Sequence, residues 1–147
     1  MILFLDDEQW RHDLVEKWHP GEVTHVFNCV QFFKAIHSPV TFTEIWLDHD
    51  LGQLNDKDPV QGDGMIASRM LVDLYMAFDH FPVPNKIKVH SFNKPAADRM
   101  VSFLTTHFYT QVTVGSCEII QEPFASPILL EERSSTPTLF ITGEEKK

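Results

Sequence analysis

Two kinds of apolar pattern alternate along the first 108 residues of the chain. Continuous or alternating apolar runs predict strands at residues 1–5, 22–27, 44–47 and 86–90. Between them, apolar residues recur at helical spacing, which predicts helices over residues 8–18, 28–37, 64–78 and 95–108. Prolines follow the first three helices and account for their ends. Strands that alternate with helices favour a parallel sheet with helices on both faces.

The spacing also predicts which helical residues are buried. In the second helix, capped by Asn28, the expected buried residues are Val30, Phe33 and Ile36. In the third helix they are Ile66, Met70, Leu74 and Phe78, and in the fourth Ala97, Val101, Leu104 and Phe108. Met65, Met70 and Met76 are interpreted as core residues rather than a cofactor site.

The pattern is weaker after residue 109. Residues 111–114 and 118–121 both fit strands, which would pair around Gly115-Ser116, and residues 126–132 fit a short last helix. We predict one domain over residues 1–133 and an exposed tail over residues 134–147. The fold class is α/β, a doubly wound, five-stranded parallel sheet with strand order 2-1-3-4-5.

Composition narrows the function. The 147 residues include 12 Lys and Arg against 21 Asp and Glu, and a net charge of −9 argues against a duplex DNA binder, which needs a basic patch. Cys29 and Cys117 have no metal-ligand spacing, so reduced thiols are expected. The N-terminus has no basic segment and only about five apolar residues, fewer than a signal sequence or membrane span requires. A cytoplasmic protein is therefore expected.

Polar side chains follow three of the predicted strands. They are Asp6-Asp7, Asp48-His49-Asp50 and His90-Ser91-Phe92-Asn93. In the predicted strand order these strands are neighbours, so their carboxyl ends meet at the edge of the sheet where α/β folds bind ligands. Four carboxylates that lie close together repel one another unless a cation lies among them. Their oxygen atoms suit a hard divalent ion, Mg²⁺ or Mn²⁺.

Each of these residues also has an ordinary structural interpretation. Asp6 and Asp7 fit the first turn of a helix, and Asn93 fits the cap of the helix that contains Pro95. His90 fits a half-buried histidine bonded to the backbone, and Ser91 a turn residue. Asp48 and Asp50 project to the same side of an extended chain and His49 to the other. Arg11 follows the first acids by about one turn and either reaches a phosphate group or is a surface charge.

The order of these residues resembles that of a response-regulator receiver domain. The similar positions are Leu5-Asp6-Asp7, Leu47-Asp48, Asp63-Gly64 and Val89-His90-Ser91. The resemblance implies a receiver-like fold in which Asp6 and Asp7 bind magnesium, Asp48 accepts phosphate and Ser91 supplies a hydroxyl group. Receivers have a lysine before a proline after the fifth strand, whereas this chain has Glu122-Pro123. A glutamate cannot neutralise an aspartyl phosphate.

A narrower family, the cyclic-phosphate processing receiver-like domains, is more similar. Its marks are an LDDE start, a DHDLG box and an HSxN box, which match residues 5–8, 48–52 and 90–93. The resemblance covers about residues 1–108 and implies action on cyclic phosphates in RNA or nucleotide metabolism.

The sequence thus predicts a metal-dependent phosphoesterase that opens a cyclic phosphate of a nucleotide or RNA end. Asp6, Asp7 and Asp48 are the expected metal ligands, His90, Asp48 and Asp50 the catalytic residues, and His49, Ser91, Asn93 and Arg11 the substrate-binding residues. Two alternatives stay open. One is a silent module that sequesters a nucleotide or a protein, and the other is a signalling receiver phosphorylated on Asp48.

Overall fold

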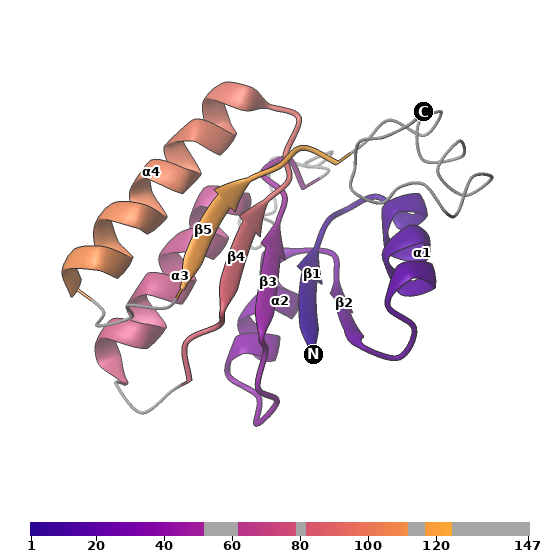
Figure 1. The fold of residues 1–147 in the computed structure, drawn as a ribbon, viewed down its shortest axis with the longest axis horizontal. Coiled ribbons are helices and arrows are strands. Elements are labelled where there is room, and N and C mark those ends of the chain that lie inside the picture. The colour runs from indigo at the N-terminus through magenta and orange to yellow at the C-terminus, as the bar shows by residue number, and fades with distance from the viewer. Residues whose placement is uncertain (52–61, 79–81, 112–116, 125–147) are drawn as a thin grey trace.

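A computed structural model describes residues 1–51, 62–78, 82–111 and 117–124. The strands are β1 (Ile2–Leu5), β2 (Val23–Val26), β3 (Glu44–Leu47), β4 (Lys86–Val89) and β5 (Glu118–Gln121). The helices are α1 (Gln9–Trp18), α2 (Cys29–Ile36), α3 (Gly64–Ala77) and α4 (Lys94–Gln111). All strand pairs are parallel, in the order β2-β1-β3-β4-β5 (Figure 1). The predicted fold class and strand order are confirmed.

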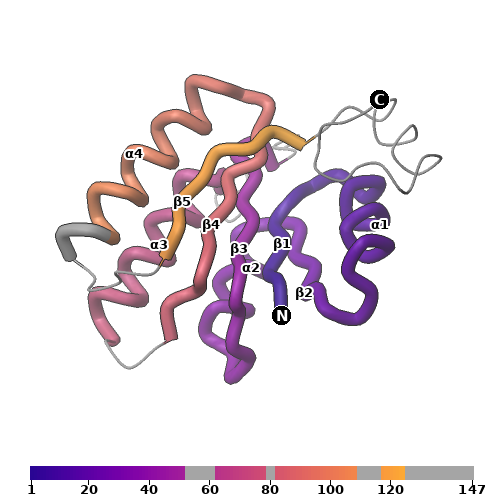
Figure 2. Tube along the Cα trace, viewed as in Figure 1, coloured from indigo at the N-terminus to yellow at the C-terminus, as the bar shows by residue number. Residues whose placement is uncertain are grey.

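The strands of the sheet are level with one another. Leu5 of β1 pairs with Leu47 of β3, Leu47 with Val89 of β4, and Val89 with Gln121 of β5. The chain path in Figure 2 places β3 at the centre of the sheet, between β1 and β4. The residues that follow these four strands therefore emerge side by side at one edge.

The alternation of side chains divides the sheet into two faces. Leu3, Leu5, Ile45, Leu47, Ile87 and Val89 belong to the larger core, together with buried residues of α2, α3 and α4. Ile2, Phe4 and Trp46 form a smaller core with Val15 of α1 and with Phe124. Asp6 follows Phe4 by two residues and Asp48 follows Trp46 by two, so both acids lie on the α1 face.

The predicted buried faces of two helices are confirmed only in part: Ile36 and Leu74 are buried as expected, and Met70 packs against the core. In α2, Phe33 is 48% exposed and Val30 36%, while Cys29, Phe32 and Ile36 are buried. The helix is apolar on most sides, so spacing alone did not identify the side that meets the sheet. In α3, Ile66 and Phe78 are exposed, and the buried positions include Ala67, Leu71, Leu74 and Tyr75. The Gly64 N–H donates to the His49 carbonyl just after β3, and this fixed start determines which side of the helix meets the sheet.

The other local predictions have mixed outcomes. Asn28 caps α2 as expected, since its side chain accepts a hydrogen bond from the Gln31 N–H. In α4, Ala97, Leu104 and Phe108 are buried. Of the strand pair predicted around Gly115-Ser116, the strand at 118–121 is confirmed as β5, Gln111 is helical instead, and residues 112–116 lie outside the described residues.

Several predictions fall on undescribed parts of the chain. The helix at 126–132 and the tail at 134–147 lie outside the described residues. Within the described ranges, no helix has both the length and the hydropathy needed to cross a membrane. Cys29 and Cys117 are free thiols, as the sequence predicts, and both are buried.

Candidate functional site

Asp6 is the most enclosed acid at the carboxyl edge of the sheet. It follows β1, is 0% exposed, and accepts hydrogen bonds on every oxygen atom. The Glu8 N–H donates to Oδ1 at 2.8 Å, Arg11 Nη1 donates to Oδ2 at 3.0 Å, and His90 Nε2 donates to Oδ2 at 2.9 Å. His12 Nε2 donates to the main-chain carbonyl at 2.8 Å. Asp6 is therefore held in a single orientation.

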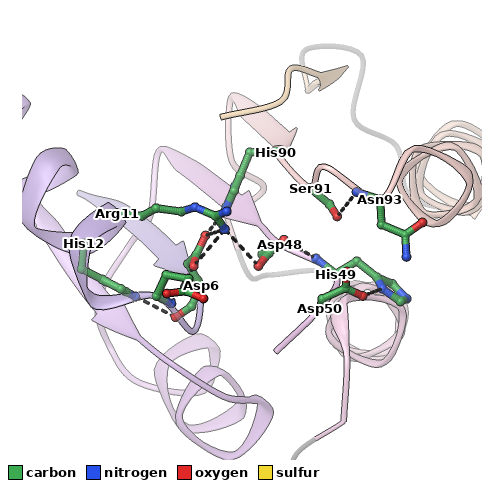
Figure 3. Close-up of polar contacts among 10 residues, drawn as sticks. Asp6, Arg11, His12, Asp48, His49, Asp50, His90, Ser91 and Asn93 are labelled. Carbon is green, nitrogen blue, oxygen red and sulfur yellow. Dashed lines mark hydrogen bonds and ion pairs between the residues drawn. The ribbon is translucent and has the colours of Figure 1, made fainter. Parts of the chain in front are cut away.

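Asp48 lies beside Asp6, because β3 and β1 are adjacent and in register. It is 3% exposed, and its Oδ1 accepts the His49 N–H at 2.9 Å. Arg11 Nη1 lies 3.6 Å from its Oδ2 and so forms ion pairs with both acids (Figure 3). Two buried carboxylates thus share one cationic group.

His90 completes this buried group from β4. Its ring stacks on Phe4, with the centroids 5.0 Å apart and the planes 16° apart, and meets Phe124 edge to face. Nε2 donates to Asp6, whereas Nδ1 has no hydrogen-bond partner in the part of the chain that the structure describes. The neutral imidazole therefore carries its proton on Nε2 and keeps a lone pair on Nδ1.

The electrostatics of the two acids differ. Burial, followed by the charge of Asp6, raises the pKa of Asp48 to about 8, against the opposing effect of Arg11. Burial also acts to raise the pKa of Asp6, but the hydrogen bonds from His90 and Glu8 and the charge of Arg11 together hold it below its ordinary value. Burial lowers the pKa of His90. Asp6 is thus ionised, whereas the surroundings of Asp48 compensate its charged form only in part and favour its protonated form.

Asp6, Asp48 and His90 each offer a ligand atom, and these atoms lie within 4.8 Å of one another. The two carboxylates supply oxygen donors that suit a divalent ion, and the imidazole lies beside them. The raised pKa of Asp48 indicates that the pair lacks positive charge, which a cation would supply. The residues therefore fit a metal. Asp7, also expected as a ligand, is half-buried and is not part of this group.

The remaining predicted site residues lie at the same edge of the sheet but are not part of the buried group of Asp6, Asp48 and His90. His49 Nδ1 lies 2.7 Å from Asp50 Oδ1, and Asp50 is directed away from the two buried acids, with a side chain 66% exposed (Figure 3). Ser91 Oγ accepts the Asn93 N–H at 3.0 Å. Asn93 Oδ1 accepts the Ala96 N–H, so Asn93 also has the capping role that the sequence allows.

Sequence reasoning missed a row of hydrogen bonds behind Asp6. His12 Nδ1 lies 2.7 Å from His25 Nδ1, and His25 Nε2 lies 2.8 Å from Glu16 Oε1. Since His12 Nε2 donates to a carbonyl, a neutral His12 accepts at Nδ1 and His25 donates from its own Nδ1. A hydrogen bond from the Gly21 N–H, followed by that from His25, lowers the pKa of Glu16. The carboxylate of Glu16 can only accept, so His25 Nε2 donates to it.

A usable signal for this row was present in the sequence. Glu16 and His12 are four residues apart on one helix face, and His25 lies on the next strand. Polar residues four apart are common on the solvent faces of helices, so the spacing becomes informative only when β1 and β2 are known to pair with Phe4 opposite His25.

A cavity of about 430 Å³ adjoins the buried group on the α1 face. It is lined by His90 and by residues that include Trp46, Lys88, Trp18 and Phe124. Lys88 Nζ lies 3.8 Å from the centre of the Trp46 ring. Glu122, which follows β5, also lines this cavity. Glutamate therefore occupies the place where the receiver resemblance implies lysine.

Comparison with known proteins agrees with the fold. Residues 1–106 match the sequence profile of the family described as the cyclic-phosphate processing receiver domain. A structure of a response regulator protein from Burkholderia pseudomallei, with a phosphorylated aspartic acid, calcium ion and citrate, is similar in fold. The TM-score is 0.51 at 15% identity, over 94% of this chain and 72% of that chain. No curated protein matches the sequence.

The profile match spans well over half of the 147 residues and contains all of the buried site. The chain belongs to the family of cyclic-phosphate processing receiver domains.

Proposed function

We propose that the protein is a metal-dependent phosphoesterase that hydrolyses a cyclic phosphate of a nucleotide or of an RNA end. One observation carries the proposal: Asp6 holds the Nε2–H of His90, while His90 Nδ1 has no partner among the described residues. A carboxylate that orients an imidazole in this way sets up the second nitrogen as a general base. A receiver that only accepts phosphate has no use for such a base.

Asp6 and Asp48 would hold the metal ion, for which Mg²⁺ and Mn²⁺ are the candidates. When bound, such an ion polarises phosphoryl oxygens and lowers the pKa of a bound water molecule. Asp7, one residue along, would complete the acidic ligands.

His90 would take the proton of the attacking water at Nδ1 and later give a proton to the alkoxide that leaves when the ring opens. Asp6 stabilises the imidazolium that forms between these two steps, since its carboxylate accepts the Nε2–H at 2.9 Å. The lowered pKa of His90 keeps the ring neutral at the start of the reaction. Phe4 stacks on the ring and limits its rotation.

The other predicted residues would bind the substrate. Arg11 supplies charge for the phosphate, and Ser91 and Asn93 supply a hydroxyl and an amide group at the same edge of the sheet. His49 donates its main-chain N–H to Asp48, and Asp50 contributes by holding the His49 ring. The cavity of about 430 Å³ beside His90, with the Trp46 ring in its wall, has room for a nucleoside.

The test is turnover of a panel of cyclic phosphates with Mg²⁺ or Mn²⁺. The panel comprises 2′,3′-cyclic nucleotides, RNA with a 2′,3′-cyclic end, ADP-ribose cyclic phosphate, 3′,5′-cyclic nucleotides and cyclic oligonucleotides. Asp48→Asn and His90→Ala should each lower kcat by a factor on the order of 10² or more. The matched controls, Asp73→Asn and His37→Ala, change exposed residues and should keep full activity. Absence of turnover for the whole panel would refute hydrolysis of this substrate class.

A non-catalytic binding module is the second candidate. Arg11 and His90 already face the acids, so an anionic ligand would find a cation and an imidazole in place. Such a module would bind a member of the panel equally well after His90→Ala and would turn over none. The exposed Glu122 disfavours the third possibility, a signalling receiver, because it would repel a phosphoryl group on Asp48. Labelling of Asp48 by acetyl phosphate would support that possibility instead.

A further inference from the structure

Arg11 lies at the position where a cation is needed. Its side chain is 13% exposed, and a single nitrogen, Nη1, serves both buried acids, at 3.0 Å from Asp6 Oδ2 and 3.6 Å from Asp48 Oδ2. The two carboxylates therefore share one nitrogen atom of the guanidinium group (Figure 3).

The rest of the guanidinium group is held by aromatic rings rather than by fixed hydrogen bonds. Its carbon lies 5.1 Å from the centre of the Trp10 ring, 5.2 Å from Phe92 and 5.8 Å from Phe124. Arg11 Nε is buried and has no partner among the residues that the structure describes. Aromatic faces attract a guanidinium without fixing the direction of its donors, so Arg11 can turn while it keeps these contacts.

We infer that Arg11 is a resident counter-ion, which gives up the carboxylates when a divalent ion binds and then pairs with the phosphate group of the ligand. This inference rests on the proposed function, because it needs both a metal and a phosphate ligand. The same Asp6 and Asp48 oxygens cannot serve an ion and a guanidinium at full strength, since the two cations would lie within a few ångströms of each other.

The phosphate ligand offers Arg11 a better partner than the acids do. A guanidinium presents paired donors that match two phosphate oxygens, whereas here one nitrogen carries all the contacts with the acids. The unpartnered Nε would gain a hydrogen bond. Of the three aromatic rings around the guanidinium group, Phe92 is the most open to solvent, with 53% of its surface exposed. The guanidinium group therefore lies on the solvent side of the acids, where a ligand would arrive.

The inference predicts opposite effects of one substitution on two ligands. Arg11→Gln should tighten Mn²⁺ binding by about tenfold, because the ion no longer displaces a cation. At saturating Mn²⁺, the same substitution should weaken the binding of inorganic phosphate by about tenfold, because the anion loses its partner. Calorimetric titration of the whole chain measures both affinities. Arg69→Gln, which removes an exposed arginine from α3, is the matched control and should change neither.

A purely structural role for Arg11 would weaken both affinities together or change neither. Circular dichroism shows whether Arg11→Gln is folded. Arg11→Lys keeps the positive charge but lacks the paired donors of a guanidinium group. In this variant Mn²⁺ should bind as in the parent, and phosphate should bind more weakly. Mn²⁺ affinity that is unchanged or weaker in folded Arg11→Gln overturns the inference and leaves the phosphoesterase proposal standing. If neither parent nor variant binds Mn²⁺, the metal-dependent function fails, and the inference with it.

Discussion

At the scale of single residues, Asp48 makes the stability of the site depend on pH. It is buried beside Asp6, and burial together with that neighbouring charge raises its pKa from 3.8 to about 8. A carboxyl group with a raised pKa stabilises the fold fully below the pKa of the unfolded chain. Without metal, this contribution is lost as the pH rises from about 4 to about 8.

Asp48→Asn should therefore stabilise the metal-free protein at high pH. An amide has nearly the same shape and never ionises, so the gain should reach roughly 1–3 kcal/mol at pH 8 and shrink toward zero at pH 4.5. Thermal melts in the presence of a chelator, at a series of pH values, measure the difference between variant and parent.

Both molecules retain Asp6 and His90, so the comparison with the parent isolates the Asp48 carboxyl group together with its coupling to these neighbours. Asp73→Asn, an exposed change on α3, should give a flat difference across the same range. If Asp48→Asn is less stable than the parent at pH 8, the negative charge of Asp48 is adequately compensated in the folded protein.

At the scale of elements, the start of α3 is fixed against the end of β3. Gly64 N–H donates to the His49 carbonyl at 2.9 Å. A Cβ at Gly64 would collide with the Asp48 carbonyl oxygen and would lie 2.7 Å from His49 Cα. Glycine at this position thus lets a helix begin directly behind the acid of β3.

Gly64→Ala should destabilise the protein by about 2–4 kcal/mol, although alanine is the better helix former by about 1 kcal/mol. The cause is displacement of backbone against backbone, which side-chain rotation cannot relieve. Chemical denaturation measures the loss. Asp73→Ala in the same helix changes an exposed residue and should stay within about 0.5 kcal/mol of the parent. An equally small effect for Gly64→Ala would mean that the junction between β3 and α3 is loose.

Sequence predicted the elements well and the helix faces poorly, for physical reasons. Prolines, glycines and capping residues mark element ends locally, so the bounds of β1, β3 and β4 could be predicted. Which side of α2 is buried depends on its contact with the sheet, because Val30 and Phe33 are as apolar as Phe32. No local pattern contains that contact.

The candidate site divides in the same way. Asp6, Asp48 and His90 could be brought together from sequence, because each follows a strand and neighbouring parallel strands end level. Asp7 and Asp50 could not be placed, since the direction of a side chain after a strand depends on the turn that follows. The hydrogen bond between His12 Nε2 and the Asp6 main-chain carbonyl joins α1 to the end of β1, and the spacing of these residues in the sequence does not predict it.

At the scale of the whole molecule, the two thiols report on global unfolding. Cys29 and Cys117 are 1% and 3% exposed, and burial raises the pKa of each to about 11. At pH 8 the folded protein should react with a disulfide reagent at least about a hundredfold more slowly than the unfolded chain. The reaction should speed up with denaturant in parallel with loss of circular dichroism. Rapid labelling of Cys117 alone would instead show that β5 separates from the sheet on its own.

The level ends of the strands have a consequence for how the gene can vary. The larger apolar core and the buried site share a single alternation along β1, β3 and β4, with the residues of that core and the site residues on opposite faces. An insertion or deletion of one codon inside any of these strands would exchange the faces beyond that point, so that a leucine or valine would enter the site and an acid or histidine would enter the core. Stability and chemistry would then be lost in one step. Natural length variation should therefore be confined to the connections between elements.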